Sequence, residues 1–192
     1  MTDTGWADAA ELLLGGSVVL IPTDTVYGLA VIPTLPGATQ RLFDLKGRGR
    51  DVPIAVLVAD DDQVRALAAH PVPPKASDLM AQFWPGGLTV VIERDPTWPG
   101  DVGDATSIGV RCPDLPALRD LCGRVGPLAT TSANLHGEPT PVTAGKAAQS
   151  FPGVPVIDGG TLAGAASTVV DCRAVPPRIL REGAIAVAVL QL

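Results

Sequence analysis

The sequence lacks the features that mark several protein classes. It holds three cysteines, an odd number, and no C-x-x-C pair, so neither a disulfide framework nor a zinc site is expected, and a reducing compartment fits best. No apolar run approaches the roughly 20 residues of a membrane-spanning helix. The first residues, MTDTGWADAAELLLGG, are acidic and lack the basic region of a secretory signal, so we expect a cytoplasmic protein.

Signatures of common catalytic machinery are also missing. The chain has neither the G-x-x-x-x-G-K-[ST] phosphate loop nor the G-x-S-x-G turn that presents a nucleophilic serine. Only two histidines, His70 and His136, could serve as bases, so Ser132 is not expected to be a nucleophile. The net charge of −6 makes tight nonspecific binding to nucleic acid a poor expectation, although it allows a local basic cleft.

What the sequence does contain is enough apolar material for one globular domain. Its 192 residues, 46% of them hydrophobic, can bury a complete core. Short apolar runs alternate irregularly with helical patterns, which predicts a single α/β domain over residues 1–192 (core about 6–185) with a mixed, twisted sheet. We expect helices at 6–14, 37–45, 60–70, 75–83, 115–122 and 143–150, and strands at 18–21, 54–58, 88–93, 107–111, 128–131, 154–157, 167–170 and 179–181.

The chain is organised around the stretch SVVLIPTDTVYGLA. Its apolar run, Val18–Ile21, is typical of a buried strand, which must end at Pro22 because proline cannot donate to a sheet ladder. The hydroxyl and carboxylate groups of Thr23–Thr25 follow at once, and α/β proteins usually bind ligands at such a sheet edge. The same residues are ordinary caps of helices and turns, so both interpretations stay open.

Several other polar groups also allow two interpretations. The basic turn with Lys46, Arg48 and Arg50 could bind phosphate or could be a solvated helix C-terminus. Arg111, on an otherwise uncharged strand, lies either at the mouth of a site or in a structural ion pair. Arg181 could serve a site or form a surface ion pair. A last group of donors could cradle an anion or cap a helix: Thr130, Thr131, Ser132 and Asn134.

Taken together and in this order, the motifs resemble those of the YrdC family. They are PTDTVYGL (22–29), KGR (46–48), Pro53, WPGGLT (84–89), SIGVR-x-P (107–113), TSAN-x-x-G (131–137), STVVD (167–171) and ILREG (179–183). The chain is most similar to the short, single-domain threonylcarbamoyl-AMP synthases of the TsaC/YrdC type. The resemblance implies a YrdC-like twisted open sheet with flanking helices and a large concave cleft. Because the chain ends soon after ILREG, the extra C-terminal domain of longer members is not expected.

The resemblance also implies a reaction. L-Threonine, bicarbonate and ATP would give threonylcarbamoyl-AMP, pyrophosphate and water, the first step of threonylcarbamoyladenosine (t6A) formation in tRNA. The amine would become a carbamate, and a carbamate oxygen would attack the α-phosphate of ATP. Such chemistry needs positioning and charge neutralisation more than covalent catalysis. A downstream threonylcarbamoyl-transferase complex acting on tRNA would use the product, with weak or no direct tRNA binding by this chain.

The family motifs assign roles to residues of this sequence. The threonine would be surrounded by Thr25, Arg111, Thr130 and Ser167. The ATP would be surrounded by Lys46, Arg48, Ser107, Ser132, Asn134, Thr140 and Arg181. Catalysis would rest on Lys46, Arg48, Ser132 and Asn134. Mg²⁺ is expected on the ATP phosphates, without an evident carboxylate cage of its own.

Two positions depart from the family pattern. Many members carry a histidine eleven residues after the motif lysine, where this chain has Leu57, and this affects one expected threonine contact. Many also have serine where this chain has His136, which alters the nucleotide pocket.

Two other functions compete with the synthase. One is an RNA-binding YrdC-like module without catalysis, against which the acidic composition and the few lysines count. The other is a carbamoyl-transfer domain of the hydrogenase-maturation type, which would need zinc-finger-like and acylphosphatase-like domains that we do not find.

Overall fold

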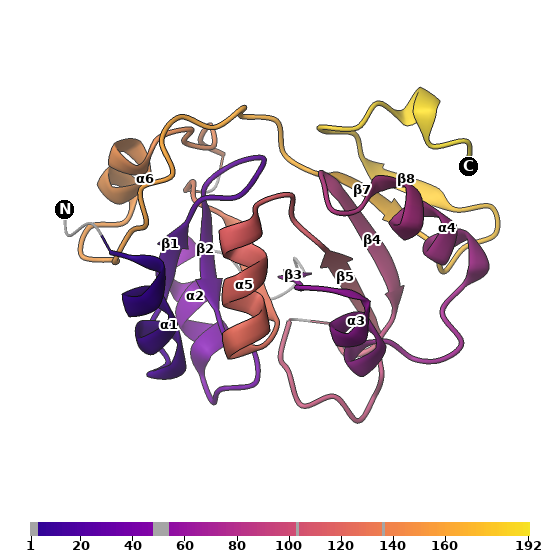
Figure 1. Ribbon diagram of the computed structural model, residues 1–192, viewed down its shortest axis with the longest axis horizontal. Coiled ribbons are helices and arrows are strands. Elements are labelled where there is room, and N and C mark those ends of the chain that lie inside the picture. Colours follow the sequence, from indigo (N-terminus) through magenta and orange to yellow (C-terminus); the bar gives the residue numbers. More distant parts are fainter. Residues whose placement is uncertain (1–3, 48–53, 103, 136) are drawn as a thin grey trace.

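One mixed sheet forms the centre of the molecule (Figure 1). The computed structural model describes residues 4–47, 54–102, 104–135 and 137–192. The strand order is β1-β2-β6-β3-β5-β4-β7-β8, in which β3–β5 and β4–β7 pair in parallel and the other neighbours are antiparallel. The strands are β1 Val19–Ile21, β2 Gly28–Val31, β3 Ala55–Leu57, β4 Leu88–Glu93, β5 Ser107–Arg111, β6 Leu128–Ser132, β7 Thr168–Asp171 and β8 Arg178–Arg181.

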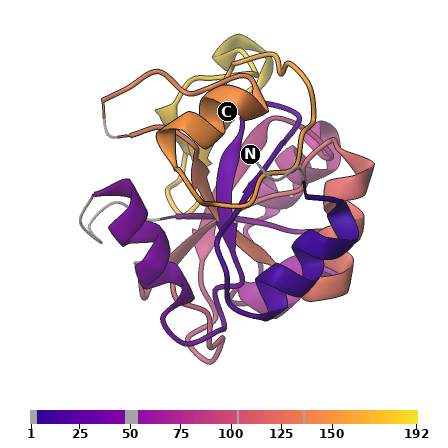
Figure 2. The same ribbon diagram turned by 90° about the vertical axis from the view of Figure 1, so that its left-hand side faces the viewer.

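Helices cover both faces of this sheet. Figure 2 shows α2 on one side of the strands and α1 with α5 on the other. Within the described ranges, no helix has both the length and the apolar character that crossing a membrane requires. The helices are α1 Trp6–Leu14, α2 Ala38–Lys46, α3 Asp61–Leu67, α4 Pro74–Phe83, α5 Pro116–Val125 and α6 Ala144–Ser150, with a short 3₁₀ turn at Val187–Val189.

Alternate residues of the strands pack into two separate cores. Leu29 of β2 belongs to the core that also holds Leu42 and Phe43 of α2. The next residue, Ala30, belongs to the opposite core with α1 and α5. Successive side chains of a strand point to opposite faces, so a strand covered on both sides reads as a continuous apolar run. This explains why the short apolar runs of the sequence predict most of the strands correctly.

The structure corrects the predicted elements at two places. Strand β2 is absent from the prediction, whereas its residues pair with both β1 and β6. The strand predicted at 154–157 is wrong. Only an isolated bridge joins Leu20 to Val156, flanked by hydrogen bonds from the Leu20 amide to Pro155 and from the Ile157 amide to Leu20. Pro155 has no amide proton, so a regular ladder cannot extend through this segment.

Part of the α1–α5 face of the sheet stays partly exposed. Helices α1 and α5 pack against Leu57 and Leu128 at one end of β3 and β6. Two residues further along, Ala55 and Thr130 are paired and half-buried. Val91 and Gly109 are also half-buried and pair with each other, whereas the residues directly before and after each of them are buried. We call this partly exposed line across the sheet the open row: Ala55, Val91, Gly109 and Thr130.

Candidate active site

The turn between β1 and β2 holds its polar groups in a fixed arrangement. The Thr23 hydroxyl accepts hydrogen bonds from the amides of Thr25 and Val26, both at 3.1 Å, and donates to the Val26 carbonyl at 2.7 Å. Thr23 therefore caps the turn, which is one of the two roles that the sequence left open for this stretch. The cap presents the next two side chains, Asp24 and Thr25, to β5.

The same turn connects segments that lie far apart in the sequence. The Tyr27 hydroxyl donates to the Gly160 carbonyl and accepts from the Gly159 amide, both at 2.9 Å. Burial raises the pKa of Tyr27, so the phenol keeps its proton for this contact. The Ala133 amide donates to the Tyr27 carbonyl at 2.8 Å. This bond connects the turn Ser132-Ala133-Asn134, which we call the SAN turn, to the turn between β1 and β2.

Arg111 ends β5 with its guanidinium held by three acceptors on two segments. Its Nε donates to the Gly86 carbonyl at 2.9 Å, its Nη1 to Thr25 Oγ1 at 2.8 Å and its Nη2 to Asp24 Oδ1 at 2.6 Å. The side chains of Arg111 and Asp24 are only 6% and 14% exposed. Arg111 thus forms the structural ion pair that the sequence allowed, and it does so beside Thr25. An arginine has five N–H donors, so a guanidinium bound in this way can still offer a fork to a carboxylate.

A second guanidinium lies near Arg111. Arg181 of β8 donates from Nε and Nη2 to the Ser167 carbonyl at 3.0 and 2.8 Å, and from Nη2 to Ser167 Oγ at 3.0 Å. Ser167 Oγ lies 2.8 Å from Thr89 Oγ1. Desolvation and the nearby charge of Arg111 lower the pKa of Arg181. Arg181 therefore contributes to a cationic region and binds Ser167 rather than a surface acid.

Lys46 is the last residue of α2 and is 4% exposed, so it does not lie in a solvated turn. Its Nζ donates to the Ser132 carbonyl at 2.8 Å, to the Asn134 carbonyl, and to Asn134 Oδ1 at 3.2 Å. The Ser132 hydroxyl donates to the same Oδ1 at 2.5 Å. Three of the four predicted catalytic residues therefore meet at one turn. The fourth, Arg48, lies outside the described residues.

The hydroxyls of Thr130 and Ser107 each donate to a residue close by in the sequence. Thr130 is on the open row, and its hydroxyl donates to the Leu128 carbonyl at 3.2 Å. A Cβ atom on Gly28 of the neighbouring strand would come within 2.7 Å of Thr130 Cγ2, so a side chain at this position would have to displace Thr130. Ser107 begins β5, and its hydroxyl donates to Asp104 Oδ2 at 2.6 Å. Hydrogen bonds to the Asp104 carboxylate, chiefly from the Ser107 hydroxyl and also from Thr106, hold the pKa of Asp104 well below its usual range.

The remaining predicted residues are not gathered at the same turn. Thr140 lies in the loop between β6 and α6, where it lines a separate cavity of about 490 Å³ with Leu135 and Lys146. Leu57, which stands in place of the family histidine, is 3% exposed and belongs to the core under α1 and α5. His136 lies outside the described residues.

Two residues of this region were missed by sequence reasoning. Asp24 pairs with Arg111, whereas the sequence analysis placed it only in the polar sheet edge Thr23–Thr25. Thr89 contacts Ser167 and received no role of its own. The signal for Asp24 was present, because a buried arginine on an uncharged strand needs a charged partner and Asp24 is the acid of the central stretch. The sequence signal for Thr89 was only its position within the WPGGLT motif.

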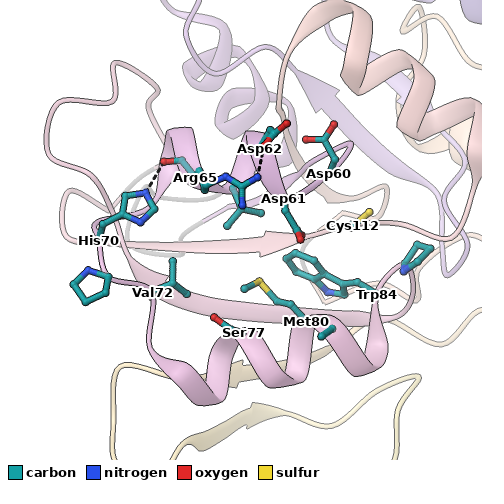
Figure 3. Close-up of a pocket in the computed structure, with 14 residues that line it drawn as sticks. Asp60, Asp61, Asp62, Arg65, His70, Val72, Ser77, Met80, Trp84 and Cys112 are labelled. Carbon is teal, nitrogen blue, oxygen red and sulfur yellow. Dashed lines mark hydrogen bonds and ion pairs between the residues drawn. The ribbon is translucent and has the colours of Figure 1, made fainter.

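A pocket of about 740 Å³ lies between α3 and α4 (Figure 3). Its walls include the acidic run Asp60–Asp62, the apolar side chains of Met80 and Trp84, and Cys112. None of its lining residues was predicted to bind a substrate. Cys112 directly follows Arg111 in the chain, and Pro85, another lining residue, precedes the Gly86 carbonyl that binds Arg111. The pocket is therefore adjacent to the Arg111 contacts and separate from the open row.

Comparison with known proteins decides the family. A family profile with the description "Telomere recombination", the Sua5/YciO/YrdC profile, matches residues 11–183. The chain belongs to the Sua5/YciO/YrdC family. A relative from Mycobacterium leprae is 38% identical over 188 residues, which are 96% of this chain and 85% of that protein. The threonylcarbamoyl-AMP synthase of Bacillus subtilis is 38% identical over 185 residues, which are 93% of this chain and 53% of that protein.

A solved structure of the Sua5/YciO/YrdC family has the same fold. The crystal structure of P. abyssi Sua5 complexed with L-threonine superposes with a TM-score of 0.90 at 33% identity, covering 97% of this chain and 57% of that one. The chain thus spans about half the length of the P. abyssi and B. subtilis proteins. The predicted family and the YrdC-like open α/β fold are confirmed.

Proposed function

We propose that this chain is a threonylcarbamoyl-AMP synthase, which converts L-threonine, bicarbonate and ATP to threonylcarbamoyl-AMP, pyrophosphate and water. The observation that supports this most directly is the 38% identity to the B. subtilis threonylcarbamoyl-AMP synthase over 93% of the chain. The P. abyssi Sua5 structure, which is complexed with L-threonine, supports the choice of amino acid.

In this proposal, threonine binds beside Arg111 at the open row. A free amino acid brings a carboxylate, and the guanidinium fork matches it. By family analogy, Thr25, Thr130 and Ser167 supply hydroxyl groups to the amino acid. A buried hydroxyl partner favours threonine over valine, because valine would leave that partner unpaired. The methyl group of threonine adds about 1–3 kcal/mol of discrimination against serine.

ATP binds next to the threonine in this proposal, at the turn that Lys46, Ser132 and Asn134 form, with Arg181 on the other side. Arg48, Ser107 and Thr140 complete the set by family analogy. The threonine amine takes up carbon dioxide from bicarbonate, and water leaves. A carbamate oxygen then forms a bond to the α-phosphorus, and the bond from that phosphorus to pyrophosphate breaks.

Positioning and charge neutralisation supply the catalysis in this scheme. The Ser132 hydroxyl donates a hydrogen bond to Asn134 Oδ1, which fits a role in binding and not a role as a nucleophile. In the described part of the chain, no group of three or more histidine, cysteine or acidic side chains could hold a metal ion. We therefore propose that Mg²⁺ arrives bound to the triphosphate of ATP.

The cellular setting is part of the same proposal. We place the reaction in the cytoplasm, upstream of a threonylcarbamoyl-transferase complex that modifies tRNA. Support comes from the three cysteines, which are all buried and unpaired, as expected for a reducing compartment: Cys112, Cys122 and Cys172.

The experiment that tests the proposal is pyrophosphate release from ATP with each substrate omitted in turn. We expect release to require both threonine and bicarbonate, with threonine preferred to serine and valine the poorest of the three. Release that does not depend on threonine would refute the assignment. Turnover of carbamoyl phosphate in place of bicarbonate would instead support a carbamoyl-transfer domain, and a salt-dependent tRNA complex without turnover would support an RNA-binding module.

A further inference from the structure

Asp24 is the charged member of the three groups that hold the Arg111 guanidinium. The other two acceptors, the Thr25 hydroxyl and the Gly86 carbonyl, are neutral. The Asp24–Arg111 contact is short, at 2.6 Å, and both side chains are largely shielded from water. The carboxylate therefore cancels the formal charge of Arg111, while the guanidinium keeps N–H donors for a ligand.

The surroundings of this pair are cationic. A short chain of contacts connects Arg111 with Arg181: Arg111 binds the Gly86 carbonyl, the Gly87 carbonyl accepts from the Thr168 amide at 2.9 Å, and Arg181 binds the adjoining Ser167 carbonyl. Desolvation, and after it the charge of Arg111, lowers the pKa of Arg181. Two neighbouring guanidinium groups without compensation are a favourable site for phosphate, because arginine binds phosphate as a fork. In the proposed reaction, ATP and pyrophosphate carry far more negative charge than the single carboxylate of threonine. The amino-acid half of the site must therefore reject them.

We propose that Asp24 is a positioning and specificity residue that sets the charge of the amino-acid site. It orients Arg111 through the Nη2 contact, and it makes the pair nearly neutral, so that Arg111 binds the carboxylate of threonine through its N–H fork without attracting the polyphosphates of the same reaction. Asp24 acts through Arg111 and does not touch the reacting atoms. This inference rests on the proposed function, because threonine defines which anion the site must select.

The test compares Asp24→Asn with the wild type. Asparagine is nearly the same size, and its amide oxygen can still accept from Arg111, so the substitution removes the charge with little change in shape. We expect inorganic pyrophosphate to bind Asp24→Asn at least about tenfold more tightly by calorimetry, because a like charge next to the ligand is lost. Pyrophosphate should also become a stronger competitor of threonine in turnover, so that the apparent KM for threonine rises as pyrophosphate is added.

Two further variants make the comparison specific. Asp78→Asn on α4 removes the same charge from an exposed position and should leave pyrophosphate binding unchanged. Asp24→Glu keeps the charge but changes the reach of the carboxylate. It should raise the KM for threonine without tightening pyrophosphate binding, and it serves as the test if Asp24→Asn does not fold.

The outcomes separate specificity from a structural role. If Asp24→Asn binds pyrophosphate no more tightly than Asp78→Asn does, or if Asp24→Glu tightens it, the inference is wrong and Asp24 only supports the fold. Because pyrophosphate binding is measured without turnover, it decides the role of Asp24 even if the protein makes no threonylcarbamoyl-AMP. A failure to make threonylcarbamoyl-AMP would count against the proposed function alone.

Discussion

Replacing Lys46 with methionine removes the ammonium that holds the SAN turn. Methionine has a similar length and is apolar, so the buried stem keeps its packing in α2. The three oxygen atoms that accept from Nζ, on Ser132 and Asn134, lose the hydrogen bonds from this ammonium. Asn134 Oδ1 keeps its bond from the Ser132 hydroxyl, so the turn loosens rather than loses all of its contacts.

The magnitude follows from these contacts. A hydrogen bond to a charged group contributes about 1.5–3 kcal/mol, and the three bonds share one ammonium, so their contributions do not simply add. Removing the ammonium also removes the cost of burying it in a residue that is 4% exposed. We therefore expect Lys46→Met to lower the free energy of unfolding by about 2–4 kcal/mol. For a chain of this size, that corresponds to a fall in Tm of roughly 5–15 °C.

Urea unfolding and thermal melting measure this loss directly. The control is Lys146→Met, which removes the same charge from an exposed position on α6 and should change the free energy of unfolding little. ATP affinity should fall in Lys46→Met because the turn that presents Ser132 and Asn134 is loosened. If Lys46→Met is as stable as Lys146→Met but has lost ATP binding, Lys46 acts on the phosphates and not through the turn.

Three further predictions concern stability and reactivity. Asp104→Asn should lower stability at neutral pH, and its difference from the wild type should shrink below about pH 4, since the folded state depresses the pKa of Asp104, chiefly through the Ser107 hydroxyl. A difference in urea unfolding that does not change with pH would contradict this. Gly28→Ala should cost about 1–3 kcal/mol and raise the KM for threonine, because the new methyl group meets Thr130. Wild-type stability in thermal melts would show that β2 can adjust. Burial raises the pKa of Cys122 to about 12, so its thiol should resist a disulfide reagent at about pH 8 until the protein is unfolded. Rapid labelling of the native protein would disprove that.

Local sequence patterns predict the elements whose signals are strong at short range. Strand β1 is an apolar run that Pro22 ends, and the structure ends it at Ile21. Strand β5 agrees with the predicted bounds, Ser107–Arg111. In both cases the β-branched residues that favour a strand lie within a few residues of the position where the strand ends. These strands can therefore be recognised without knowing which distant strands pair with them.

Strand β2 shows where such reasoning stops. Its residues, Gly28–Val31, include glycine and alanine, which are poor strand formers. They become a strand because β6 pairs with them in a register that sets Gly28 opposite Ser132. Conversely, the segment 154–157 has the composition of a strand but lies beside β1 with only one bridge. Pairing between distant segments decided both cases.

The site follows the same rule. Family motifs point to Arg111, Lys46 and Ser167 as isolated positions, but they do not show how the side chains pair. Arg111 and Asp24 are 87 residues apart in the sequence, and Lys46 and Asn134 are 88 residues apart. The fold brings each pair together. Only the folded structure shows that Arg111, the candidate partner of the threonine carboxylate, forms an ion pair with Asp24.

The most direct test of the central claim is mass spectrometry of the product formed from threonine, ATP and isotopically labelled bicarbonate. If the site around Arg111 and Arg181 makes threonylcarbamoyl-AMP, the product carries the label between the threonine nitrogen and the AMP phosphate. An unlabelled adenylate, in which the threonine carboxylate is joined directly to AMP, would contradict the account, and so would the absence of any threonine-containing nucleotide.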